Sequence, residues 1–446
     1  MQTKEKKEKA KELWELGYKT IIELESGEGI LASSREELFG AIFGRDSLIT
    51  ALKLLEVYKI KKDKYFLSLV MKIIFGLARL QGREINVESG EEPGKCIHEY
   101  RRSNHDRLTK AAKKPWYVYP DGEMRNYDSV DSTPLYLITC YRYYQLSKDK
   151  EFLIRILPSI EMALLWLLDC GDYGKNGVLK CLERNTDDNI FIDYEMNSLR
   201  KHGGLLTQGW MDSADSVFHE DGTEVKRPIN PVEVQSYSYL ALRLWARHFE
   251  ENNDKIRSES INSRALKLKE EFNKKFIIEV NEEIVIPFAI DGTEKPLISP
   301  RSSIGHLLWA SLNKKNDGFN DSILENKYLP KAVERLMKKD LFVPEAGFRT
   351  LSSLSHRYNP NSYHNGSIWP HDTAIAAEGL EKLGFLKEAE ASKEALFQAF
   401  LHFKTPLELF VYDNDYKEYT VENKPRATKK QAWSAAAMLW VSASFS

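Results

Sequence analysis

The chain has 446 residues, 42% of them hydrophobic, and a formal net charge of -2, a composition typical of a globular protein with a large core and without the basic surplus of a nucleic-acid-binding protein. No run of about 18 apolar residues could cross a membrane, and the charged N-terminus lacks the apolar stretch of a secretory signal. The four cysteines, Cys96, Cys140, Cys170 and Cys181, form no CxxC pair, so we expect a protein of the reducing cytoplasm.

Twelve helices are predicted from apolar residues that recur every three and four positions. In chain order they cover residues 4–24, 45–60, 64–81, 131–147, 150–170, 233–251, 258–275, 301–313, 326–339, 371–384, 387–403 and 430–444. Asp131, before Ser132, is predicted to cap one helix, and Pro370 suits the first turn of another. Strands are expected only near 276–289, as a hairpin that turns at Asn281.

The connections between these helices differ in length. Three are short and charged, at residues 61–63, 147–149 and 252–254, whereas those that precede every second helix are long and rich in Gly, Trp, Tyr, Asp and Arg. Long loops in compact domains usually serve a function. If the helix pairs close into a ring, all the long loops lie at one end of the inner helices. The alternative, an α-solenoid, lacks its repeat period here, and without an internal linker we expect a single domain.

Clusters of polar and aromatic residues occupy the long loops, at residues 43–47, 127–134, 207–216, 231–239, 364–372 and 407–415, and a seventh cluster at 429–437 opens the last helix. Carbohydrate sites combine rings that cover a sugar face with fixed polar groups that bond its hydroxyls. The clusters therefore predict a carbohydrate substrate. The candidate sugar-binding residues are Phe43, Arg45, Asp46, Tyr127, Asp131, Gln208, Gly209, Trp210, Glu233, Gln235, Tyr237, His364, Asn365, Trp369, His371, Gln431 and Trp433.

Asp212 is the first catalytic candidate, because it lies in a polar loop and not in an apolar stripe. Hydrolysis of a glycosidic bond needs one protonated carboxyl group and a second carboxylate. Structural alternatives stay open: Asp212 as a turn former, Arg45 and Asp46 as a cap and ion pair, Asp131 as a helix cap, and the tryptophans as core residues. We find no metal-ligand spacing, nucleotide-binding loop or serine-nucleophile motif, so we expect no metal ion and no cofactor.

Together the clusters resemble the amylo-α-1,6-glucosidase domain of glycogen debranching enzymes. From about residue 28 to the C-terminus the chain carries FGRDSL, EPGKCIHEYR, YDSVDSTPLY, TQGWMDS, PVEVQSYSY, NGSIWPHDTAIAA and QAWSAAA in the family's order. Their joint order is specific, whereas any one string is weak. The resemblance, which extends to glucoamylase-like, trehalase-like and mannosylglycerate-hydrolase-like enzymes, implies an all-α fold, a single (α/α)6 toroid over residues 1–446.

The resemblance also implies roles for individual residues. The aspartate of the family's QGWxDS motif is the general acid, which corresponds to Asp212. The family's base lies in a segment written like PELF, which corresponds to Glu408. Arg45 and Asp46 match sugar-binding groups, and Trp369 matches a subsite wall.

Two departures from the family pattern stand near these residues. The family commonly reads QGWKDS, and Met211 replaces the lysine here; a stretch often written VACSPQAW reads ATKKQAW, with Lys429 and Lys430. We expect the two lysines to alter the mouth of the site. The chain also lacks the N-terminal sugar-binding or transferase domains of full debranching enzymes, which favours small substrates over polymers.

The base assignment has competitors among the glutamates. Glu408 is flanked by apolar residues, so it has either a buried partner or a function. Glu233 begins a predicted helix, where the helix dipole favours a carboxylate. Glu345 suits a loop or ion pair, and Glu418 a charged surface.

We therefore expect an inverting glycoside hydrolase that releases glucose from an α-1,6-linked stub or a short gluco-oligosaccharide. In such enzymes the two carboxyl groups lie about 6.5–9.5 Å apart. One alternative is a hydrolase of a small α-glycoside such as glucosylglycerate or mannosylglycerate, which a basic cluster in the pocket would favour. A second alternative is a non-catalytic carbohydrate-binding protein. The sequence leaves the oligomeric state open.

Overall fold

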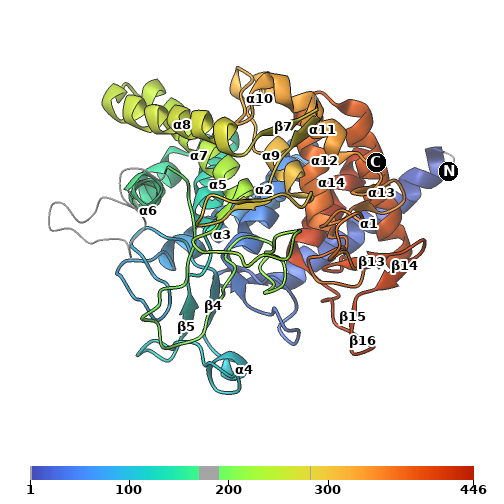
Figure 1. The fold of residues 1–446 in the computed structure, drawn as a ribbon, viewed down its shortest axis with the longest axis horizontal. Coiled ribbons are helices and arrows are strands. Elements are labelled where there is room, and N and C mark those ends of the chain that lie inside the picture. Colours follow the sequence, from blue (N-terminus) through green and yellow to red (C-terminus); the bar gives the residue numbers. More distant parts are fainter. Residues whose placement is uncertain (1–2, 170–189, 282, 446) are drawn as a thin grey trace.

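The computed structural model describes residues 3–169, 190–281 and 283–445 (Figure 1). Six helices form an inner set, each packed against the next, and the last packs against the first. They are α2 (Gly44–Lys61), α5 (Ser132–Ser147), α7 (Val232–Glu251), α9 (Ser303–Trp309), α12 (Pro370–Lys382) and α14 (Ala432–Phe445).

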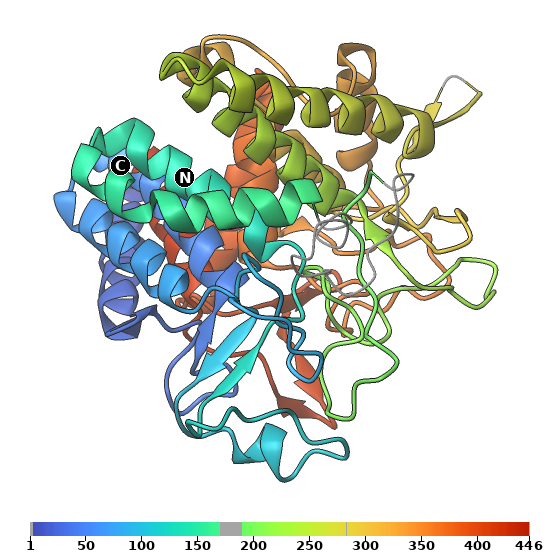
Figure 2. The ribbon, with the colours of Figure 1, turned by 90° about the vertical axis from the view of Figure 1, so that its left-hand side faces the viewer.

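A second set of six helices packs outside the first, one against each inner helix. In the order of their inner partners α2 to α14 they are α3 (Lys64–Arg79), α6 (Lys150–Asp169), α8 (Lys255–Lys275), α11 (Leu329–Leu336), α13 (Leu386–Phe403) and α1 (Thr3–Leu24). Because α1 packs against α14, the two ends of the chain lie on the same side of the molecule (Figures 1 and 2).

Burial follows from the position of each helix. The inner helix α14 is buried at every residue from Ala432 to Ala443, so its sequence shows no polar face. The outer helix α8 buries a single stripe of residues spaced three and four apart. That stripe comprises Ser258, Ile261, Ala265, Leu268 and Phe272.

The short corners between inner and outer helices share one local design. A residue with left-handed backbone lies at or just after the C-cap of the inner helix, and the next residue is an aspartate that caps the outer helix. At the first corner the Asp63 carboxylate accepts a hydrogen bond of 2.9 Å from the amide of Tyr65. The pairs are Lys62–Asp63, Lys148–Asp149 and Asn253–Asp254. Three charged triplets of the sequence thus produce three tight reversals.

The long connections carry short strands. All of them pair antiparallel, and two sheets have three strands. In the first, β4 (Glu99–Arg101) lies between β3 (Ile42–Phe43) and β5 (Met124–Asn126); in the second, β9 (Ala289–Ile290) lies between β6 (Asn230–Pro231) and β10 (Pro296–Leu297). The two-stranded pairs are β1 (Glu25–Ser26) with β2 (Gly29–Ile30), β7 (Ile278–Val280) with β8 (Glu283–Val285), β11 (Phe342–Val343) with β12 (Gly347–Phe348), β13 (Phe410–Tyr412) with β14 (Tyr416–Glu418), and β15 (Thr420–Val421) with β16 (Lys424–Pro425). Short helical turns, α4 (Asp106–Thr109), α10 (Lys314–Asp317) and the 3-10 helix η1 (Asn326–Tyr328), complete the connections.

Most helix predictions are confirmed to within a few residues. The helix expected over 301–313 is shorter, at Ser303–Trp309, and that expected over 326–339 begins as η1 and ends at Leu336. The hairpin near 276–289 is confirmed, with Asn281 in the left-handed region at φ 49°. The expectation of strands only there was wrong, because pairs of two or three residues leave no periodic signal in a sequence.

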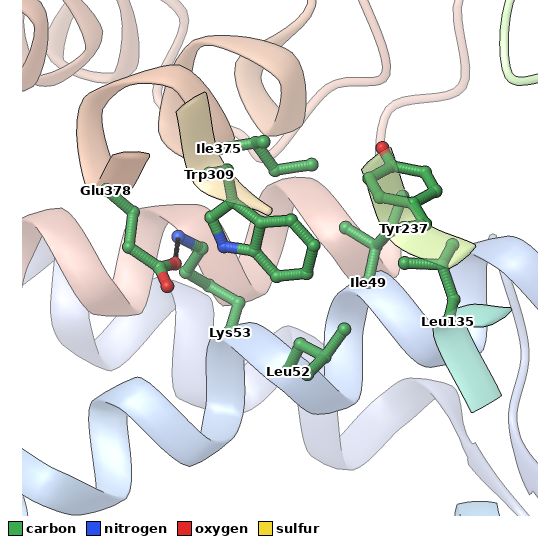
Figure 3. Close-up of a pocket in the computed structure, with 8 residues that line it drawn as sticks. All are labelled: Ile49, Leu52, Lys53, Leu135, Tyr237, Trp309, Ile375 and Glu378. Carbon is green, nitrogen blue, oxygen red and sulfur yellow. Dashed lines mark hydrogen bonds and ion pairs between the residues drawn. The ribbon is translucent and has the colours of Figure 1, made fainter. Parts of the chain in front are cut away.

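The centre of the inner set is filled by side chains (Figure 3). A small cavity there is lined by residues of five inner helices, with Trp309 between the Lys53–Glu378 ion pair and the Tyr237 ring. The volume of this cavity is about 10 Å³, enough for about one water molecule. Access to a site at the ends of these helices is therefore from the side of the loops.

Two findings concern the wider character of the chain. No helix in the described part of the chain is both long and apolar enough to cross a bilayer. Cys96 and Cys140 are buried free thiols, and Cys170 and Cys181 lie outside the described residues.

Candidate active site

The motif-bearing loops meet at the N-terminal ends of the inner helices. The connections that carry β4, β5 and β13 to β16 gather on one side of the helices in both views (Figures 1 and 2). Backbone hydrogen bonds join neighbouring loops: the Val130 amide donates to the Gln208 carbonyl at 3.1 Å, and Ile368 and Phe410 exchange two bonds of 2.9 Å. Segments distant in sequence are thereby held side by side.

Arg45, in the first turn of α2, is the centre of one buried cluster. Its Nε donates to Asp131 Oδ2 at 2.5 Å, its Nη1 to Asp212 Oδ2 at 3.2 Å, and its Nη2 to the Gly209 carbonyl at 2.7 Å. Ser129 Oγ donates to the other Asp131 oxygen at 2.6 Å. The planar guanidinium therefore fixes the loop before α5 and the loop that carries Asp212.

The expectation that Asp131 caps helix α5 was wrong. The residue has helical backbone angles, and its carboxylate makes no capping hydrogen bond. The Arg45 guanidinium and the Ser129 hydroxyl take the carboxylate oxygens instead. Because Arg45 comes 86 residues earlier in the chain, the local cap pattern could not reveal this partner.

Asp46, next to Arg45, begins a hydrogen-bonded chain to Glu408. Gln431 Nε2 donates to Asp46 Oδ1 at 3.0 Å, and Gln431 Oε1 accepts from Thr428 Oγ1 at 2.7 Å. The amide of Thr428 then donates to Glu408 Oε2 at 3.0 Å. Two adjacent residues of α2 thus connect to the two catalytic candidates, Arg45 to Asp212 and Asp46 to Glu408.

Glu408 is 2% exposed and lies just before strand β13. Its Oε1 accepts a short hydrogen bond from the Tyr363 hydroxyl, and its backbone amide donates to the Thr428 carbonyl at 3.0 Å. Its buried partners are thus neutral donors, and among the described residues no cation pairs with the carboxylate.

Three carboxyl groups of the site lie within electrostatic reach of one another. Burial raises the pKa of Glu408 to about 7, and the negative charge of Asp212 adds to this rise. Burial likewise raises the pKa of Asp46 to about 7, with Arg45 opposing the rise and Asp212 and Glu408 adding to it. Although a quarter of its side chain is exposed, Asp212 also has a raised pKa, through desolvation that outweighs the stabilising charge of Arg45.

An aromatic cluster lies beside these carboxyl groups. Three indole rings each stack on an imidazole, and the indoles meet edge to face at 5.8 and 5.9 Å. Burial holds the pKa of His364 and of His371 well below the usual range, so both rings are neutral. The stacked pairs are Trp210–His306, Trp369–His364 and Trp433–His371.

Glu233 lies under the loop that leads to Asp212. It is fully buried in the first turn of α7, and neither carboxylate oxygen has a hydrogen-bond partner among the described residues. Burial raises its pKa to about 8, so it is neutral near pH 7. A Cβ at Gly209 would lie 3.0 Å from Glu233 Oε1, so a side chain at this position would require the glutamate to shift.

Four more of the residues predicted to bind sugar contact other parts of the protein. Tyr127 donates to the Leu80 carbonyl at 2.9 Å, and the Gln235 side chain bonds the backbone of Ile192. Both therefore have structural partners away from the carboxyl groups. Tyr237 shares a hydrogen bond with His306, the ring that stacks on Trp210. Gln208 contributes its backbone carbonyl to the loop contact described above.

Two more predicted residues lie at the edges of the site. Phe43 is the residue before α2, and its ring meets His98 edge to face at 5.5 Å. Asn365 bonds Asp215 with its amide nitrogen and accepts from Arg301 with its oxygen. The competing bases Glu345 and Glu418 are exposed.

The amylo-alpha-1,6-glucosidase family matches residues 115–440, almost three quarters of the chain. The chain belongs to this family. No curated protein matches the sequence. Glycoside hydrolase is thus the class that the family establishes.

Solved structures show the same fold at low sequence identity. Mannosylglycerate hydrolase of family GH63 from Thermus thermophilus, in complex with Tris and D-glycerate, is 11% identical, with a TM-score of 0.61 over 96% of this chain and 99% of that one. The same enzyme in complex with glucose is 12% identical, with a TM-score of 0.59 over the same shares. A glycosidase variant in complex with glucose is 13% identical, with a TM-score of 0.55 over 98% of each chain.

The departures from the amylo-α-1,6-glucosidase pattern have physical explanations. Met211 is buried, and its sulfur lies 3.5 Å from the guanidinium of Arg301; a lysine there would place a second cation beside a buried one. Lys429 and Lys430 form ion pairs with Glu418 and Glu23. Both lysine charges are thereby partly neutralised at the surface.

Three residues of the site were missed in the sequence. Tyr363 stands one position before the HNGSIWPHD cluster, and Thr428 lies within the ATKKQAW stretch, of which the sequence pattern pointed to the lysines, Gln431 and Trp433 but not to Thr428. Arg301 is 2% exposed and bonds the Ser216 and His364 carbonyls at 2.6 and 2.7 Å. A single buried arginine in an otherwise polar stretch gives no motif, so only the fold reveals that it joins two loops.

Among residues 3–169, 190–281 and 283–445 no group of three or more His, Cys, Asp or Glu side chains could hold a metal ion. The expectation that catalysis needs neither metal nor cofactor stays a prediction.

Proposed function

We propose that the chain is an inverting glycoside hydrolase that releases glucose from an α-glucoside, with Asp212 as the general acid and Glu408 as the general base. Asp212 would protonate the glycosidic oxygen while Glu408 removes a proton from a water molecule that attacks the anomeric carbon from the opposite face. Membership of the amylo-α-1,6-glucosidase family supports the reaction class.

The observation that carries the proposal is the connection of both carboxyl groups to one turn of α2. Arg45 bonds Asp212 directly, and Asp46 reaches Glu408 through Gln431 and Thr428. The raised pKa of Asp212 favours a protonated acid, and a base with a pKa of about 7 can be ionised near neutral pH. The separation of about 6.5–9.5 Å that inversion requires stays a prediction.

We also propose that residues 1–446 form a single domain, an (α/α)6 toroid. The cyclic packing of the six inner helices and the one outer partner of each support this assignment. A cytoplasmic location likewise stays a prediction.

The substrate that we favour is an α-1,6-linked glucose stub or a short gluco-oligosaccharide. Three cations near the carboxyl groups in the described part of the chain already have partners: Arg45 bonds two carboxylates, Arg301 bonds buried oxygens, and Lys429 pairs with Glu418. An acidic aglycone, as in glucosylglycerate or mannosylglycerate, would need a cation that is free. The fold shared with mannosylglycerate hydrolase keeps that class as the second candidate.

A panel of isomaltose, panose, glucosylglycerate and mannosylglycerate tests both candidates. Asp212→Asn and Glu408→Gln should keep the fold and retain less than a tenth of wild-type hydrolysis. The matched control is Glu345→Gln, an exposed glutamate outside the site, which should leave turnover unchanged. Wild-type protein that binds these sugars without turning any of them over would favour a non-catalytic binding protein.

The stereochemistry of the product tests inversion. Proton NMR of the first turnovers should show β-glucose released from an α-glucoside. Initial release of α-glucose would contradict the proposed mechanism.

A further inference from the structure

The carboxylate of Glu408 is held by donors on both oxygens. The Tyr363 hydroxyl donates to Oε1, and the amide of Thr428 donates to Oε2 at 3.0 Å, whereas the single proton of the Thr428 hydroxyl goes to Gln431 Oε1 at 2.7 Å. A carboxylate has about four acceptor positions. The two donors occupy about one position on each oxygen, so they fix the orientation of the carboxylate and leave its remaining positions for a water molecule.

Tyr363 is itself fixed in place. Its backbone carbonyl accepts hydrogen bonds from Trp369 Nε1 at 3.0 Å and from Ser367 Oγ at 2.6 Å. Its ring meets Trp369 edge to face at 4.9 Å and also contacts Tyr419. The phenol therefore lies in a packed ring cluster and presents its hydroxyl to Glu408 from a fixed direction.

Burial and the neighbouring negative charges keep the Tyr363 hydroxyl protonated. Burial, the Glu408 carboxylate and the Asp212 carboxylate hold its pKa well above the usual range. The hydroxyl thus remains a donor when Glu408 is ionised. A donor bonded to a carboxylate stabilises the charged form, which opposes the effect of burial on Glu408.

We propose that Tyr363 is a positioning residue for the base: its hydroxyl holds the Glu408 carboxylate in the orientation from which the carboxylate accepts a proton from the attacking water. The inference rests on the proposed role of Glu408. Tyr363 takes no part in bond making, and the proton moves from water to Glu408.

Tyr363→Phe tests the inference, because it removes one hydroxyl and keeps the ring. A hydrogen bond from a neutral donor stabilises the ionised carboxylate, so its loss should raise the pKa of the base by about one unit or more. The acid limb of the kcat/KM profile, which reports the free base, should move to higher pH by that amount. The value of kcat/KM at the optimum should fall by about tenfold or more.

The chain offers a matched control in Tyr239. Its buried phenol also donates to a carboxylate, that of Asp321 at 2.5 Å, on the outward side of α7. Tyr239→Phe removes the same group from a similar bond, so its effect on stability should be comparable. Its pH profile should coincide with that of the wild type. A loss of activity in Tyr363→Phe without a shift of the acid limb would show a merely structural role and overturn the inference.

A second variant keeps the test decisive if Tyr363→Phe fails to fold. 3-Fluorotyrosine at position 363 retains the hydroxyl and makes it a stronger donor, so the acid limb should move to lower pH. A limb unchanged from the wild type would overturn the inference.

Glu408→Gln, measured in the same assay, separates the inference from the proposed function. If this variant is inactive and neither Tyr363 variant shifts the limb, the proposed base stands and the role of Tyr363 falls. If it keeps wild-type activity, Glu408 is not the base and both proposals fall.

Discussion

Replacing Arg45 by methionine is the sharpest test of the acid cluster. The substitution removes three hydrogen bonds, to Asp131, Asp212 and the Gly209 carbonyl. The Asp131 side chain is fully buried and would retain only the Ser129 hydroxyl. Removing one partner of a buried ion pair costs about 3–5 kcal/mol, because the other charge is left uncompensated. We expect Arg45→Met to lower the free energy of unfolding by that amount.

A second substitution distinguishes the buried charge from lost packing. Arg45→Met combined with Asp131→Asn removes both charges, which can be nearly neutral for a buried pair. The double variant should recover about 2 kcal/mol or more, with a remaining loss of about 1 kcal/mol from the unpaired Gly209 carbonyl. Hydrolysis should stay below a tenth of the wild-type rate, because Asp212 has lost its partner in both variants.

Urea unfolding monitored by circular dichroism measures these differences. The control is Arg257→Met, whose guanidinium is half exposed and pairs with Asp254 and Glu161; its cost should stay within about 1 kcal/mol. A loss below about 1 kcal/mol for Arg45→Met, or a double variant less stable than the single one, would refute the reasoning.

Three further predictions concern pH, metals and substrate size. The pKa of Glu408 is raised from 4.5 to about 7 in the folded protein, so its contribution to stability is present below about pH 4.5 and is lost as pH rises through 7. The stability of Glu408→Gln relative to the wild type, measured by urea unfolding, should therefore increase between pH 5 and pH 8, by up to about 3 kcal/mol. An equal stability difference at both pH values would contradict the shift. EDTA should leave turnover of an α-glucoside intact, and complete loss restored by a divalent ion would reveal a metal site. Isomaltose or panose should be cleaved at least as fast as glycogen limit dextrin, and a much faster rate on the dextrin would contradict a small-substrate site.

The helices could be predicted from the sequence because their signals are local. Apolar spacing marked α1, α2 and α13 almost to the residue, and the charged triplet at 61–63 marked the tight reversal before α3. The predicted ends of α9 and α11 were less accurate. There the chain passes into short turns, η1 among them, whose composition resembles that of the adjoining helix.

The contacts of the site could be predicted only where a motif carried them. Arg45, Asp46, Asp212 and Glu408 came from family motifs, and in the structure Arg45 bonds Asp212 while Gln431 and Thr428 connect Asp46 to Glu408. Tyr363 could not be found this way, because its partner lies 45 residues further on. A tyrosine beside a histidine in a loop carries no signal until the fold brings a carboxylate to its hydroxyl.

The position of the site at the N-terminal ends of the inner helices opposes the effect of burial on two of its carboxyl groups. Burial and mutual repulsion would keep closely placed carboxyl groups protonated, whereas the partial positive charge of helix N-termini favours the ionised forms. Asp46 lies in the first turn of α2 and Glu233 in that of α7. With a pKa of about 7 for both Asp46 and Glu408, the protonated and ionised forms of each carboxyl group are close in free energy near neutral pH. A site that must hold one carboxyl group protonated and another ionised at the same time is served by such a balance.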